Sequence, residues 1–215
     1  MKKTSLIIIT IIACLSGILY YKEYNKNIFF IGNSITAYGL SPDIGWYGNW
    51  GMAASSEDND FVHKTVEKLK NPRFQVINLG EFEYRYSAMD LSFLRPYKNA
   101  KLFVLVYQAG ENVDPNKIDE LKYTEHVQSL IKYINPKHVI IISEFWPDPH
   151  KFQTMLAFTK ANGYSYVDIS KVMFIDGATA KGKYKNDAVA LHPSDKGMEL
   201  ISDELLKTIQ PIFKK

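Results

Sequence analysis

Beyond position 27, the hydrophobic residues occur in short continuous runs separated by longer amphipathic stretches. The runs predict five strands, at residues 28–32, 74–78, 102–107, 139–143 and 164–168. The third and fourth runs are apolar throughout, which suits parallel strands that are covered on both faces.

Between these runs, apolar residues recur at helical spacing. The pattern predicts helices at residues 60–69, 118–134, 151–162 and 195–209. Ser55 or Ser56 is the expected N-cap of the first helix and Ser194 that of the last, with Pro211 just beyond its end. Regular alternation of strands and helices favours a three-layer α/β/α sandwich around a parallel five-stranded sheet.

The first 27 residues have a different pattern. Two lysines precede an apolar stretch from Leu6 to Tyr21, the signature of an export signal. The stretch has no clear cleavage site, so we expect an uncleaved signal anchor and linker at 1–27, with a domain at 28–215 outside the cytoplasm, periplasmic or extracellular. A cleaved signal, or a lipoprotein modified at Cys14, is the alternative.

Composition narrows the function classes. The 215-residue chain has a formal net charge of +3, with basic and acidic residues interleaved, so no basic stripe suits nucleic acid. Cys14 is the single cysteine, which leaves the exported domain without a disulfide. We find no ligand spacing typical of a metal site and no glycine loop for phosphate, and we expect no cofactor.

Candidate chemistry follows the predicted strands. Ser34 comes two residues after the first strand, Gly80 follows the second, Asn112 follows the third, and His192 precedes the last helix. Because the carboxyl ends of parallel strands meet at one edge of a sheet, we expect these residues to gather there.

These residue types suit acyl transfer. A serine hydroxyl becomes a useful nucleophile when a base such as His192 takes its proton. The negative charge that develops on an attacked ester carbonyl needs preset donors, and the N–H groups of Ser34 and Gly80 and the amide of Asn112 can supply them.

At this point the chain resembles the SGNH (GDSL-like) hydrolases. Residues 32–36, Gly-Asn-Ser-Ile-Thr, are similar to the family's first block, a variant of Gly-Asp-Ser; Gly80 matches the second block, residues 110–112 the Gly-x-Asn of the third, and His192 the fifth. The resemblance covers roughly residues 28–210. It implies a flavodoxin-like fold, Ser34 as nucleophile, His192 as base, and Ser34, Gly80 and Asn112 as oxyanion donors.

The sequence departs from the family pattern at one position. The family usually has an aspartate three residues before the histidine, where this chain has Val189. Asp187 is the candidate acid that orients His192; a backbone carbonyl or another acid such as Glu111 is the alternative. This third group fixes the tautomer and the orientation of the base.

We therefore expect a membrane-anchored serine esterase that removes small acyl groups, acetyl above all, from an acylated glycan. Two alternatives remain: an O-acyltransferase to sugar hydroxyls with the same Ser/His pair, and a glycan-binding module without catalysis. The aromatic segment 45–51 is either a wall for sugar stacking or ordinary loop packing, and Trp146 is a candidate for the pocket wall.

Overall fold

The computed structural model describes residues 27–98 and 103–214, and its centre is a sheet of five parallel strands. The strand order is β2-β1-β3-β4-β5. The strands are β1 Ile28–Gly32, β2 Phe74–Asn78, β3 Val104–Gln108, β4 His138–Ile142 and β5 Ser165–Val167. All residues of β1 and β3 are buried, whereas the edge strand β2 is partly exposed. The predicted α/β fold with a five-stranded parallel sheet is confirmed.

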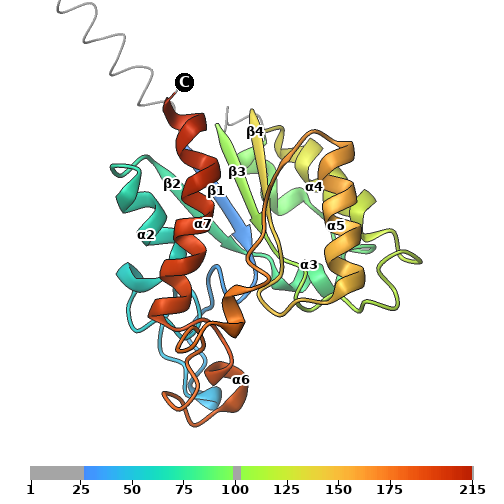
Figure 1. Ribbon diagram of the computed structural model, residues 1–215. Helices are drawn as coiled ribbons and strands as arrows, with labels where there is room; N and C mark the ends of the chain where they lie inside the picture. The colour runs from blue at the N-terminus through green and yellow to red at the C-terminus, as the bar shows by residue number, and fades with distance from the viewer. Residues whose placement is uncertain (1–26, 99–102, 215) are drawn as a thin grey trace, which may run out of the picture.

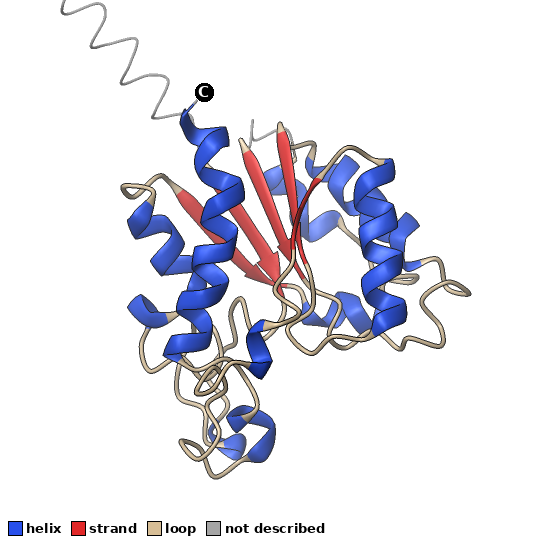
Figure 2. Cartoon of the chain, in the orientation of Figure 1, coloured by secondary structure: helices blue, strands red, loops and turns tan. Residues whose placement is uncertain are grey.

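Helices cover both faces of the sheet (Figure 1). They are α2 Phe61–Lys68, α3 Gly80–Arg85, α4 Tyr123–Ile134, α5 Pro149–Ala161, α6 Asp187–Ala190 and α7 Asp195–Lys214. Short 3-10 turns occur at η1 Pro42–Ile44, η2 Glu57–Asn59, η3 Ser92–Tyr97 and η4 Val172–Phe174. Figure 2 shows the sheet between these helices, with long loops gathered below the strand tips.

Each face of the sheet has its own apolar core. Successive side chains of a strand point to opposite faces, so Phe30 packs in the layer of α2 and α7, together with Phe61. Phe29 lies on the other face, in the layer that includes Phe82 of α3 and Leu130 of α4. Because both faces of the sheet are packed against helices, successive residues of a central strand are all buried. The strands therefore correspond to continuous apolar runs in the sequence.

Several predicted helix ends were wrong. The N-cap of α2 is Asp60, not Ser55 or Ser56, because its carboxylate accepts from the N–H of His63 at 2.8 Å. The helix predicted from 118 begins at Tyr123, after a series of turns. The last helix runs through Pro211 to Lys214 and does not stop before the proline, although Pro211 has no N–H to donate to the carbonyl four residues earlier. Neither α3 nor α6 was predicted.

A third, smaller core lies in the lobe at the bottom of Figure 1, which contains α6. The loop after β1 contributes Trp46 and Met52, and the segment before α7 contributes Ala180 and Val189. The Trp46 indole donates to the carbonyl of Tyr38 at 2.9 Å, and its side chain is buried. Trp46 therefore packs the loop and does not form a sugar-stacking wall.

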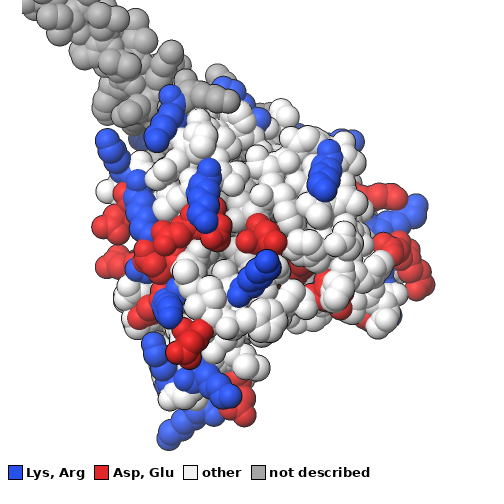
Figure 3. All heavy atoms as spheres, in the orientation of Figure 1, with Lys and Arg blue, Asp and Glu red and all other residues white. Residues whose placement is uncertain are grey.

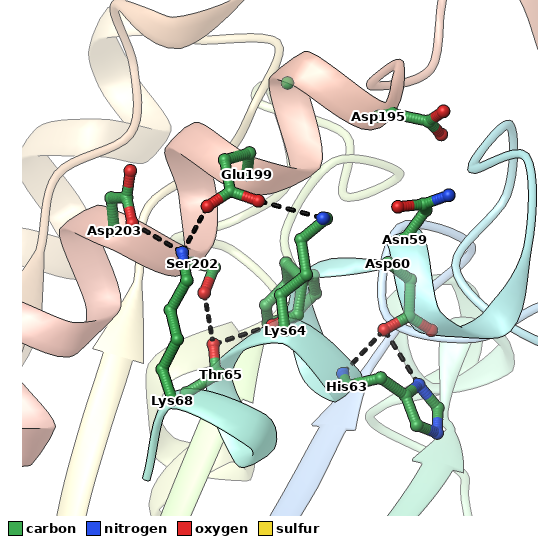
Figure 4. Close-up of polar contacts among 12 residues, drawn as sticks. Asn59, Asp60, His63, Lys64, Thr65, Lys68, Asp195, Glu199, Ser202 and Asp203 are labelled. Atoms are coloured by element: carbon green, nitrogen blue, oxygen red, sulfur yellow. Dashed lines mark hydrogen bonds and ion pairs between the residues drawn. The ribbon is translucent and has the colours of Figure 1, made fainter.

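Polar side chains join α2 to α7 at the surface (Figure 4). Lys68 donates to Asp203 at 2.8 Å and also contacts Glu199, which lies 2.9 Å from Lys64. Beneath them, the Thr65 hydroxyl donates to that of Ser202 at 3.0 Å. Lysine, arginine and acidic residues are interspersed over the face shown in Figure 3.

Within residues 27–98 and 103–214, no helix combines the length and apolar character needed to cross a membrane. The predicted anchor and Cys14 lie outside the described residues.

Candidate active site

The turn after β1 places Ser34 at the carboxyl edge of the sheet. The N–H groups of Thr36 and Ala37 both donate to the carbonyl of Asn33 at 3.0 Å, and the Ile35 N–H donates to the Asn33 side-chain oxygen. Gly32 is necessary here because an added Cβ would lie 2.0 Å from Oγ1 of Thr36. The backbone thus leaves the sheet abruptly, and Ser34 is partly exposed at its edge.

Ser34 and His192 are in direct contact, although 158 positions separate them. Their Oγ and Nε2 atoms lie 2.8 Å apart. The other ring nitrogen, Nδ1, lies 2.7 Å from the carbonyl oxygen of Ala188. Because a carbonyl only accepts, Nδ1 carries the proton, and Nε2 offers its lone pair to the Ser34 hydroxyl. This is the tautomer that a general base needs.

The surroundings of His192 keep its ring neutral. The side chain is 8% exposed, and the Trp146 ring stands edge-on to it with centroids 4.8 Å apart. Burial lowers the pKa of His192 to about 4, against a smaller opposing effect of the Ala188 carbonyl. Trp146 therefore lies beside the base, and its place in a pocket wall stays a prediction.

The group behind His192 is a backbone carbonyl and not the carboxylate of Asp187. Asp187 is exposed at the start of α6, and its own carbonyl accepts from Leu191. The backbone N–H of His192 donates to the carbonyl of Val189, and the ring Nδ1–H donates to the carbonyl of Ala188. The expectation for Asp187 is corrected accordingly: the Ala188 carbonyl of the one-turn helix α6 faces the ring.

Val189 occupies the position where the family usually has its acid. Its side chain is fully buried in the small core with Trp46 and Met52. Residue 189 thus serves packing in this chain. Glu111, the other acid considered, contacts Gln108, Phe145 and Asn33.

Gly80 and Asn112 reach the same edge of the sheet, and both already have internal hydrogen bonds. The Gly80 N–H donates to the side-chain oxygen of Asn78 at 2.8 Å. The Asn112 amide donates to Glu83 at 2.7 Å. An amide NH₂ group has two hydrogens, so Asn112 retains a second donor, whereas the Gly80 N–H is already bonded to Asn78.

Three buried charged side chains behind these residues were not predicted from the sequence. Glu83, Glu144 and Lys151 are each at most 4% exposed. The Lys151 ammonium donates to the carbonyls of Gly110 at 2.8 Å and Glu111 at 3.0 Å. A side chain at position 110 would meet Glu144 at 2.8 Å, in a backbone conformation (φ +140°) that favours glycine. The available signal was a concentration of acids just after the strands.

Burial raises the pKa of both Glu83 and Glu144. Burial, followed by the charge of Glu83, raises the pKa of Glu111 to about 8. One oxygen of Glu144 has no hydrogen-bond partner among the described residues. In the same part of the chain, no group of three or more His, Cys, Asp or Glu side chains is arranged to hold a metal ion.

Comparison with known proteins supports the fold at low sequence identity. No protein family model matches the chain, and no curated protein is similar to it. Among solved structures, a protein from Bacteroides ovatus named as a GDSL-like lipase matches with a TM-score of 0.56 and 14% identity, over 86% of this chain and 98% of that one. A protein of the same description from Bacteroides uniformis gives 0.57 and 14%, over 89% and 99%.

A two-domain esterase active on acetylated mannans, crystallised with mannopentaose, matches with a TM-score of 0.56 and 14% identity. The match covers 94% of this chain and 54% of that protein. These likenesses establish that the chain has the fold of GDSL-type hydrolases.

Proposed function

We propose that this protein is a serine esterase that removes small acyl groups, acetyl above all, from a glycan outside the cytoplasm. The observation that carries the proposal is the hydrogen-bonded series Ser34 Oγ, His192 Nε2, His192 Nδ1 and the Ala188 carbonyl. It joins a nucleophile to a base in the correct tautomer, which a surface turn does not require.

The geometry supports a two-step reaction. Ser34 Oγ attacks the ester carbonyl carbon as its proton passes to His192 Nε2, giving a tetrahedral intermediate. Its oxyanion accepts from the Ser34 N–H, from the second amide hydrogen of Asn112, and from the Gly80 N–H after Asn78 moves. His192 then protonates the leaving alcohol, and an acyl-enzyme remains. Water, deprotonated by His192, releases the acid and restores Ser34.

The absence of a carboxylate behind His192 shapes this mechanism. The Ala188 carbonyl orients the ring, but it stabilises the imidazolium less than a carboxylate would. We therefore expect moderate turnover with ordinary esters. The preserved Ser34–His192 contact argues against a glycan-binding module without catalysis.

The glycan substrate rests on two considerations. Structural neighbours include the esterase active on acetylated mannans and an acetyl-xylooligosaccharide esterase from Geobacillus, here in a mutant form, with a TM-score of 0.50 and 17% identity. The second is the expected export signal, which supports a polymer substrate outside the cytoplasm. An acyltransferase would use the same acyl-enzyme but pass the acyl group to a sugar hydroxyl.

A labelling experiment tests the nucleophile. Full-length protein in mild detergent is treated with a fluorophosphonate probe, and the modified peptide is identified by mass spectrometry. We expect labelling at Ser34 and loss of labelling in Ser34→Ala. In His192→Ala, we expect the rate of labelling to fall at least a hundred-fold. Ser87→Ala, at an exposed serine, is the matched control. Unlabelled wild-type protein that is folded by circular dichroism would refute the proposal.

Product analysis separates hydrolysis from transfer. With p-nitrophenyl acetate and an excess of mannooligosaccharide, a hydrolase releases acetate in proportion to p-nitrophenol. Acetylated sugar appearing in place of acetate would establish the acyltransferase instead.

The location has its own test. We expect the protein to remain in the membrane fraction after an alkaline carbonate wash, and its domain to be degraded when protease is added outside that membrane. Release by the wash, or protection from the protease, would contradict an anchored, external domain.

A further inference from the structure

Glu83 connects three of the loops that form the candidate active site. It lies on α3, which begins directly after β2, and it faces inward where its neighbours Glu81 and Tyr84 are exposed. Its carboxylate meets Asn33, which follows β1, and residues 110–112, which follow β3. Glu83 is the point where the ends of the three strands are linked.

Every hydrogen bond that reaches Glu83 comes from an N–H group. Oε1 accepts from the Asn33 amide at 3.3 Å, from the Gly110 N–H, and from the Asn112 N–H at 3.4 Å. Oε2 accepts from the Asn112 side-chain amide at 2.7 Å. Such a set of donors fits an ionised carboxylate, since both oxygens only accept. It fixes both the backbone and the side chain of Asn112.

Asn33 separates two acidic side chains. Its side-chain oxygen accepts from the Ile35 N–H at 3.0 Å, so its NH₂ group faces away from that turn. The two amide hydrogens go to Glu83 and to Glu111. An aspartate in this place would add a third carboxyl group and remove both donors. The related motif reads Gly-Asp-Ser and has an aspartate at this position. Here the neighbouring side chains are glutamates, and the amide of Asn33 supplies the donors that they accept.

We infer that Glu83 is a positioning residue for the esterase reaction, holding the Asn112 amide so that its second hydrogen points to the oxyanion, and that Asn33 must be an amide because it joins Glu83 to Glu111. This inference rests on the proposed function. Glu83 touches no reacting atom and acts through Asn112.

The test compares three variants of the full-length protein. They are Glu83→Gln, Asn33→Asp, and the double variant in which the carboxylate and the amide exchange places. Glu81→Gln, an exposed glutamate two residues away, is the matched control. Hydrolysis of p-nitrophenyl acetate gives kcat and KM separately, and urea unfolding gives the midpoint for each variant.

In Glu83→Gln, one acceptor oxygen becomes an NH₂ group that opposes an N–H of the loop. We expect kcat to fall ten- to a hundred-fold while KM changes less than three-fold, because the oxyanion donor acts mainly in the transition state. We expect Asn33→Asp to lower both kcat and the urea midpoint. The double variant should recover at least five-fold in kcat and a higher midpoint relative to Asn33→Asp.

The outcomes are distinguishable. Active wild-type protein with an unchanged kcat in Glu83→Gln would overturn the positioning role and leave the proposed function standing. A double variant no better than Asn33→Asp, in rate and in urea midpoint, would overturn the matching of Asn33 to Glu83. Inactive, unlabelled wild-type protein would overturn the proposed function and the positioning role together, while the urea midpoints would still decide the matching.

Discussion

The surface between α2 and α7 and the interior behind Ser34 both contain glutamates and lysine, but they stabilise these charges by different means. At the surface, Glu199 lies between Lys64 and Lys68, and each carboxylate faces an ammonium group. In the interior, Glu83 faces N–H groups, and the Lys151 ammonium faces carbonyl oxygens. At the surface, opposite charges contact each other directly. In the interior, Gly110 lies between them: its N–H donates to Glu83 and its carbonyl accepts from Lys151.

The two environments shift acid pKa values in opposite directions. Hydrogen bonds from Lys68 and then Lys64 lower the pKa of Glu199. Burial, followed by the charge of Glu83, raises that of Glu111. Burial has the corresponding effect on a base and lowers the pKa of His192. Surface charge pairs therefore add modest stability. In the interior, burial shifts the pKa values of Glu111 and His192, and amide and carbonyl groups hold the charged side chains in place.

The largest expected effect comes from removing the buried ammonium group. Lys151→Met keeps the aliphatic stem but leaves the carbonyls of Gly110 and Glu111 without their donor and Glu144 without a nearby positive charge. We expect a loss of about 3 kcal/mol in the free energy of unfolding, measured by urea denaturation.

The matched control is Lys68→Met on the surface of α2. Its partners Glu199 and Asp203 are 39% and 51% exposed, so solvent screens the pairs, and we expect a loss below about 1 kcal/mol. Equal losses for the two substitutions would remove the distinction between the regions.

The second prediction concerns stability against pH. With a folded pKa of about 8 and an ordinary value of 4.5, Glu111 keeps a proton in the folded protein that the unfolded chain has lost. Its contribution to the free energy of unfolding therefore falls as pH rises from about 4.5 to 8. Urea unfolding over this range should show that Glu111→Gln removes this fall.

Glu199→Gln should act in the opposite direction. Because the pKa of Glu199 is lowered, its contribution is present above the ordinary value of 4.5 and is lost as pH falls through the folded pKa. The substitution should cost a little stability at neutral pH and flatten the acid side of the curve. The same sign for both variants would contradict the comparison.

The smallest expected effect concerns the reaction rate against pH. Because burial lowers the pKa of His192 to about 4, its base form persists well below neutrality. We expect kcat/KM for p-nitrophenyl acetate to be constant down to about pH 5 and to fall to half near pH 4, with folding followed by circular dichroism.

Asp187→Asn should change neither the rate, beyond about two-fold, nor this profile, because the Asp187 carboxylate is exposed and the Ala188 carbonyl holds the ring. A half-point near 6.5, or one that moves in Asp187→Asn, would show that the ring is solvated or paired with that acid.

Much of the fold was predictable because local patterns carry it. The apolar runs 28–32 and 74–78 are β1 and β2 as predicted, and the other three strands differ by one or two residues at their ends. Ser194 is the N-cap of α7 as predicted, since its hydroxyl accepts from the Gly197 N–H. Helix ends were less predictable, because Asp60 competes with nearby serines as a cap and Pro211 is tolerated in a final turn.

The sequence by itself determined the alternation of strands and helices, with Ser34, Gly80 and Asn112 after strands and His192 before the last helix, since hydrophobic period and strand ends are local properties. The tertiary structure alone decided what stands behind them. Every residue has a backbone carbonyl, so the residue type at position 188 does not reveal that this carbonyl orients His192. The contacts of Glu83 with Asn33 and Asn112 span 50 and 29 positions, and such contacts depend on how three loops pack, which no local pattern records.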